Sequence, residues 1–174
     1  MDQEKAARLA RAGFELWQAG RLEDAAAKYG EALEYADPDH YSLEAYDGEF
    51  AAILAALGRN EDALEQHELA LTVSLRLSAT GDDPSVLVAR YFFGEQLLRM
   101  GNADKALAIV QAHVTRSSRQ DWMLKLDEAK ALWALGRQAE ARPVAESAVQ
   151  AGSTDEHRER IRTDLAGVLD SGGA

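Results

Sequence analysis

The sequence contains no cysteine, so it can form neither a disulfide framework nor a zinc site built from thiolates. It has only three prolines in 174 residues, which leaves long stretches without a helix breaker. No apolar run approaches the roughly 20 residues that a transmembrane helix needs. The opening residues, MDQEKAARLARAG, lack the apolar core of a signal peptide. These absences lead us to expect a cytoplasmic protein that does not enter a membrane.

Acidic residues outnumber basic ones by 30 to 19, which gives a formal charge of −11. A surface of this sign repels nucleic acids and anionic membranes and favours basic partners. A solvated acidic surface that only keeps the protein soluble explains the same charge. The charge therefore argues against a nucleic-acid or membrane partner and leaves a basic protein client open.

The residue types that carry catalysis or bind metals are not arranged in recognisable motifs. The four histidines, His40, His67, His113 and His157, are never one helical turn apart, so no pair is preset for a metal. Glycines occur singly at expected turns and not in a loop that could hold a phosphate. We therefore expect a protein that is not an enzyme and has neither a cofactor nor a metal.

Four glycines mark an internal repeat: Gly20, Gly58, Gly101 and Gly136. Each has a leucine four residues before it and an alanine five residues after it, and three of them have a second alanine at twelve. His113 takes that second position in the third repeat. The glycines are 38, 43 and 35 residues apart, a period typical of a solenoid of stacked units.

The spacing around each glycine predicts a pair of antiparallel helices. The glycine supplies the left-handed residue that ends the first helix, and the second helix begins two or three residues later. Positions five and twelve lie two turns apart on one face of that second helix. Alanine at both positions lets the two helix axes approach closely.

The boundaries of the repeats follow from polar and proline-containing segments. The Asp-Pro pairs in ADPDH (36–40) and GDDPS (81–85) end one repeat and begin the next, which predicts repeats over 4–37, 38–80, 84–117 and 119–152. Ser153 and Glu156 fit a capping box that begins a final helix over 154–170. We expect this helix to cover the end of the stack, residues 1–170 to form a single domain, and residues 171–174 to be disordered.

With these motifs, the chain resembles the tetratricopeptide repeat (TPR) family. The segments LWQAGRLEDAAAKYGEALEYADP and LWALGRQAEARPVAESAV carry the resemblance, with the small residues Gly13, Ala51, Gly94 and Ala129 seven before each turn glycine. The resemblance implies an all-α, right-handed superhelical solenoid of four helix-turn-helix units with a C-terminal capping helix. The long helix from Asn60 to about Ser78 is similar to the elongated repeats of kinesin light chains.

The resemblance also implies a concave groove made by the first helix of each pair. The groove positions map to Ala10, Arg11, Phe14, Trp17, Gln18, Gly48, Glu49, Ala52, Ala55, Ala56, Tyr91, Phe92, Glu95, Leu98, Arg99, Leu126, Asp127, Lys130, Trp133 and Ala134. Among these, peptide or protein binding is expected from Arg11, Phe14, Trp17, Glu49, Ala52, Tyr91, Phe92, Glu95, Arg99, Lys130 and Trp133. Ala10 and Phe14 replace the lysine and asparagine with which chaperone-binding relatives hold a peptide carboxylate, which argues against heat-shock chaperone tails as ligands.

The function implied by the resemblance is a non-catalytic scaffold that binds a protein or peptide in an apolar, aromatic groove. Two alternatives stay open at this point. The chain fits an acidic secretion chaperone or immunity-type inhibitor that masks a basic or aggregation-prone client. It also fits a structural module that self-associates, for example as a homodimer whose partner fills the groove. Separately, packing between neighbouring repeats alone explains Trp17 and Trp133.

Overall fold

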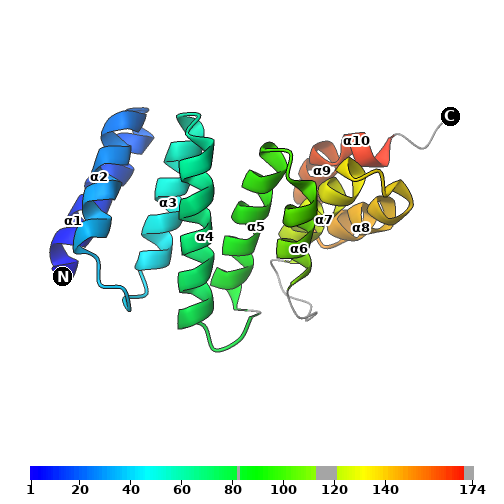
Figure 1. Cartoon of the computed structure of the whole chain (residues 1–174). Helices are drawn as coiled ribbons and strands as arrows, with labels where there is room; N and C mark the ends of the chain where they lie inside the picture. Colours follow the sequence, from blue (N-terminus) through cyan, green and yellow to red (C-terminus); the bar gives the residue numbers. More distant parts are fainter. Residues whose placement is uncertain (82, 113–120, 171–174) are drawn as a thin grey trace. The chain divides into compact units, whose positions relative to one another are not determined.

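The computed structural model describes residues 1–81, 83–112 and 121–170, and within these ranges it contains helices and turns but no strand (Figure 1). The all-α fold class is therefore confirmed. The chain divides into two compact units, residues 1–79 and 80–174, and the division falls at the end of the second predicted repeat. His113, which replaces the second alanine in the third repeat, and the tail at 171–174, which is predicted to be disordered, lie outside the described residues.

The first unit consists of two helix pairs. Helix α1 (Gln3–Gln18) packs against α2 (Leu22–Tyr35), α3 (Leu43–Ala56) packs against α4 (Asn60–Leu77), and α2 packs against α3. One buried cluster of this unit consists mainly of alanine, with Tyr29, Tyr46 and Ile53 as its larger members, and Leu54, Leu71 and Val73 are buried as well. Alanine at the helix contacts allows the helices to approach closely around these larger side chains.

The second unit begins with α5 (Pro84–Arg99), α6 (Ala103–Gln111), α7 (Asp121–Ala134) and α8 (Gln138–Gln150). Helix α7 contacts α5, α6 and α8 and so occupies the centre of this unit. Two short helices follow, α9 (Asp155–Asp164) and α10 (Ala166–Leu169), and both pack against α8.

The turn glycines adopt the conformation that the repeat pattern predicts. Their φ angles lie between 74° and 76°. At the second turn, the N–H of Arg59 donates to the carbonyl of Leu54 at 2.9 Å and the N–H of Gly58 donates to that of Ala55 at 3.1 Å. These two bonds form a Schellman motif, which ends α3 and satisfies two of its last carbonyl groups. The other three turns repeat the motif with the same spacing.

The small residues of the pattern are buried where helices touch. Ala25, Ala32, Ala63, Ala70, Ala106, Ala141 and Ala148 all have exposed fractions of at most 3%. Gly13 lies beneath the ring of Tyr29, and a Cβ atom added to it would come within 2.8 Å of that ring. The alanine and glycine positions therefore set the distance between helices, as the sequence predicts.

The C-terminal helix differs from its prediction in two respects. Thr154 rather than Ser153 caps α9, because its hydroxyl accepts a hydrogen bond from the N–H of His157 at 3.1 Å. The helix also does not continue to residue 170, since α9 ends at Asp164 and α10 begins after Leu165. The break turns Leu165 and Val168 into the interior, with exposed fractions of 1% and 6%.

Replacing Gly58 with alanine is expected to lower the free energy of unfolding by about 1 kcal/mol, because a side chain is strained at its φ of +76°. Gly48 is the matched control, since it lies inside α3 with open space around it. Gly48→Ala is expected to be neutral or to stabilise by up to about 1 kcal/mol. Urea unfolding of both variants measures the difference, and equal effects of the two substitutions would contradict the assignment of the turn.

Candidate protein-binding faces

In the first unit, α1 presents a pair of aromatic side chains. Phe14 is 39% exposed, and its ring meets that of Trp17 edge to face at a centroid distance of 6.1 Å. Trp17 is half-buried and packs on the core below it. Arg11, also on α1, is exposed and forms an ion pair with Glu15 at 3.2 Å. Helix α1 therefore holds an exposed phenylalanine on a supporting tryptophan, beside a guanidinium group.

The two candidate residues on α3 differ in how free they are to bind a partner. The carboxylate of Glu49 accepts a hydrogen bond from the Tyr29 hydroxyl at 2.6 Å, and Tyr29 is fully buried. Glu49 thus satisfies a buried phenol, and burial, followed by this hydrogen bond, raises the pKa of Tyr29 above its usual range. Ala52 is half-buried, and its short side chain projects little from α3.

In the second unit, α5 carries the corresponding aromatic pair. The rings of Tyr91 and Phe92 lie 5.1 Å apart, and Phe92 is 44% exposed. Tyr91 packs against the buried cluster of α5, α6 and α7, and burial raises the pKa of its phenol. One turn further along α5, Glu95 pairs with Arg99 at 3.7 Å. Helix α5 therefore presents an exposed aromatic ring and, one turn later, an ion pair whose two charges cancel.

Three of the positions that the resemblance places in the groove are buried instead. Ala10, Leu126 and Asp127 have exposed fractions of 4%, 1% and 0%. Asp127 faces the backbone of Gly94, where a Cβ atom would lie 3.2 Å from its Oδ2. Neither carboxyl oxygen of Asp127 has a hydrogen-bond partner among the described residues, and burial raises its pKa to about 8. Burial therefore favours the neutral, protonated form of the Asp127 carboxyl group.

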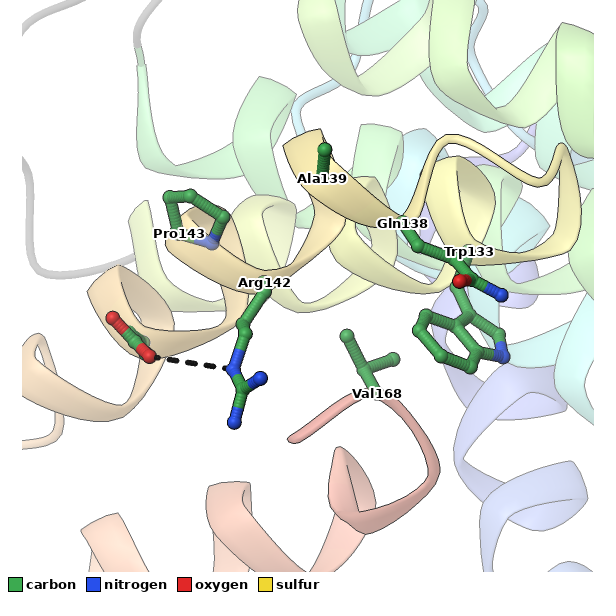
Figure 2. Close-up of a pocket in the computed structure, with 7 residues that line it drawn as sticks. Trp133, Gln138, Ala139, Arg142, Pro143 and Val168 are labelled. Atoms are coloured by element: carbon green, nitrogen blue, oxygen red, sulfur yellow. Dashed lines mark ion pairs between the residues drawn. The ribbon is translucent and has the colours of Figure 1, made fainter. Parts of the chain in front are cut away.

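The last two candidates, Lys130 and Trp133, lie on α7. Both are half-buried, and Lys130 opposes the rise in the pKa of Asp127. The indole of Trp133 lines a cavity of about 340 Å³ together with residues of α8 and α10 (Figure 2). The remaining lining residues are Gln138, Ala139, Arg142, Pro143, Glu146 and Val168.

The cavity beside Trp133 has an apolar side and a charged end. Figure 2 shows the indole facing Val168, with Arg142 farther from the indole. Arg142 forms an ion pair with Glu146, with 3.8 Å between the charged groups. Arg142 also donates to the carbonyl of Leu169 at 3.1 Å, which ties α8 to α10. Sequence reasoning missed this cavity because its far wall comes from α10, whose position depends on the break after Leu165.

In the described ranges, no three histidine or acidic side chains lie close enough together to hold a metal ion. The same part of the chain has no helix that is both long and apolar enough to cross a membrane. The main features of the candidate residues are an aromatic pair on α1, an aromatic pair on α5, and a tryptophan that lines a cavity.

Neither a scan against protein-family models nor a search of the curated proteins finds a match. Solved structures do match. The chain is similar to a kinesin light chain with nearly identical TPR-like repeats from Podosopora anserina, with a TM-score of 0.74 and 19% identity over 98% of this chain and 88% of the other. It is also similar to MamA from Desulfovibrio magneticus RS-1, with a TM-score of 0.67 and 16% identity over 98% of each chain.

A third similar structure is YrrB, a TPR protein with an unusual peptide-binding site, with a TM-score of 0.62 and 17% identity over 97% of this chain and 89% of YrrB. All three are repeat proteins of one architecture. The fold of this chain is therefore that of the TPR proteins, and the prediction made from the glycine and alanine pattern is confirmed. Identities below 20% establish this common fold and leave function to be argued from the residues.

Proposed function

We propose that this protein is a non-catalytic scaffold that binds a protein or peptide segment through the aromatic faces of its first helices. The observation that carries the proposal is that each unit exposes a phenylalanine supported by a second aromatic ring. Phe14 rests on Trp17 in the first unit and Phe92 beside Tyr91 in the second. Both phenylalanines are about two-fifths exposed, although they sit next to rings that contribute to the core.

Such an arrangement suits an anchor for a partner. The buried neighbour restricts the exposed ring, so binding costs little side-chain entropy, and the exposed edge offers apolar area to an incoming side chain. Aromatic residues on a rigid helix are typical of the few positions that dominate binding energy at protein interfaces. The fold supports the same class of function, because repeat solenoids offer extended surfaces to other proteins.

Phe14→Ala is expected to weaken binding of the natural partner about 30-fold, the effect of losing a contact worth about 2 kcal/mol. The partner is first captured from an extract of the source cells with the full chain as bait and is then purified. Isothermal titration calorimetry gives the dissociation constants of wild type and variant, and circular dichroism verifies that the variant keeps its helix content.

Tyr41→Ala is the matched control, because Tyr41 is the more exposed aromatic residue, at 79%, but lies between α2 and α3 and not on a first helix. We expect this variant to bind as the wild type does. If Phe14→Ala and Phe92→Ala both bind normally, or if Tyr41→Ala weakens binding as strongly, the aromatic faces of the first helices are not the binding surface.

A further inference from the structure

The negative charge of this protein is concentrated in its first unit. Residues 1–79 contain sixteen acidic and seven basic residues, so they carry −9 of the total charge of −11. The second unit is close to neutral in comparison. A basic partner is therefore attracted mainly to the first unit.

The basic residues of the first unit are all engaged in contacts within it. Six form ion pairs with acidic residues, namely Arg8, Arg11, Arg21, Lys28, Arg59 and Arg76. The seventh, Lys5, lies over the ring of Tyr35 at 3.5 Å. The carboxylates that remain have no cation of their own unit to neutralise them.

Three of these carboxylates share one face of α4 with exposed leucines. Glu61, Glu65 and Glu68 follow each other at intervals of four and three residues, and Leu69 and Leu75 lie on either side of this row of glutamates, about 120° apart around the helix axis. The leucines are 44% and 43% exposed, and none of the three glutamates forms an ion pair with a described residue. We name these five residues the α4 outer face.

The α4 outer face is exposed because it lies on the side of the helix that points away from α3. The opposite side of the helix packs on α3 through Ala63, Ala70 and Leu71, which are buried. Helix α4 has 18 residues and α3 has 14, so α4 extends beyond α3 at its C-terminal end (Figure 1). Arg76, the one cation near Leu75, is held by Asp39 and by the carbonyl of Pro38.

We propose that the α4 outer face binds a basic amphipathic helix of a partner protein. Lysine or arginine side chains of that helix pair with Glu61, Glu65 and Glu68, and its apolar side chains cover Leu69 and Leu75. A basic amphipathic helix fits this face, because the face combines apolar area with carboxylates that no residue of its own unit neutralises. This surface is separate from the aromatic pair of α1 and goes beyond the function proposed above.

The test uses a defined probe and the full chain. The probe is a synthetic amphipathic helix of about 18 residues, with leucine on one face and lysine on the other, labelled for fluorescence anisotropy. We expect binding that weakens strongly between about 50 and 300 mM salt, and no binding of a matched peptide with glutamate in place of lysine. Glu65→Gln combined with Glu68→Gln is expected to weaken binding about fivefold, and Leu69→Ser combined with Leu75→Ser about tenfold.

Glu23→Gln combined with Glu34→Gln is the matched control, because it removes the same charge from exposed positions of α2. We expect it to weaken binding less than about twofold. Phe14→Ala is expected to bind the probe normally, which separates this surface from the aromatic face of α1. If the α2 and α4 variants lose the same amount of affinity for the probe, binding depends only on net charge and the proposal is overturned. A clear fall in thermal stability of the Leu69→Ser and Leu75→Ser variant would also overturn it, because the leucines would then be packed inside the protein.

Discussion

Asp127→Asn is expected to raise the free energy of unfolding of the second unit at pH 8 by about 5 kcal/mol and to leave it nearly unchanged near pH 4. Asp127 is fully buried against Gly94, and its carboxyl oxygens have no hydrogen-bond partner in the described part of the chain. Burial raises its pKa to about 8, and Glu95 adds to the rise while Lys130 opposes it. Asparagine has nearly the same shape and is neutral at every pH.

The direction in which the free energy of unfolding changes with pH follows from the pKa of Asp127 in the folded and the unfolded chain. An unfolded aspartate loses its proton near pH 4, whereas the folded protein keeps the proton on Asp127 until about pH 8. The stability that this proton contributes is complete below about pH 4 and is lost progressively up to about pH 8, by about 1.4 kcal/mol per pH unit. Stability should therefore fall as pH rises across this window, and the asparagine variant should lack that part of the slope.

Urea unfolding across the pH window measures the effect. In a Trp17→Phe background, the remaining tryptophans, Trp122 and Trp133, both lie in the second unit, so their fluorescence follows that unit alone. Asp47→Asn is a matched variant in the first unit, where burial raises the pKa of Asp47 to about 7. We expect it to leave this fluorescence transition unchanged. An Asp127→Asn variant with the stability and slope of its parent would show that Asp127 is ionised in the folded protein.

Ala63→Leu is expected to lower the free energy of unfolding by about 3 kcal/mol. Ala63 is fully buried where α4 packs on α3, seven residues before the equally small and buried Ala70. A leucine there adds three carbon atoms between two helices whose separation is set by alanine, so the helices must separate or the side chain must leave its preferred rotamer.

Ala27→Leu provides the comparison, because Ala27 is an exposed alanine on α2. Its substitution should change stability by no more than about 0.5 kcal/mol. Thermal unfolding followed by circular dichroism measures both variants. An Ala63→Leu protein as stable as the wild type would mean that the alanine spacing does not control how closely the helices pack.

The parts of the fold that the sequence predicts correctly depend on neighbours close in the chain. The left-handed glycine of each turn and the alanines on the facing helix are separated by five and twelve residues, so one local pattern specifies both. Four copies of that pattern define the architecture without knowledge of distant contacts.

The features that the sequence does not reveal depend on contacts between distant segments. Asp127 is three residues from Lys130 and looks like a solvent-facing residue, but the approach of Gly94 from α5 buries it. The break after Leu165 likewise follows from packing of α10 on α8, and that packing creates the cavity beside Trp133. Of the candidate binding residues, Phe14 and Phe92 are partly exposed, whereas Glu49 satisfies a buried phenol.

Hydroxyl-radical footprinting of the chain, with and without its purified partner, tests the central claim most directly. We expect oxidation of Phe14 and Phe92 to fall when the partner binds, because both exposed rings become covered. Tyr41, which is 79% exposed between α2 and α3, serves as the internal reference and should be oxidised at the same rate in both samples. Unchanged oxidation of both phenylalanines in a saturated complex would contradict the proposal that the first helices bind the partner.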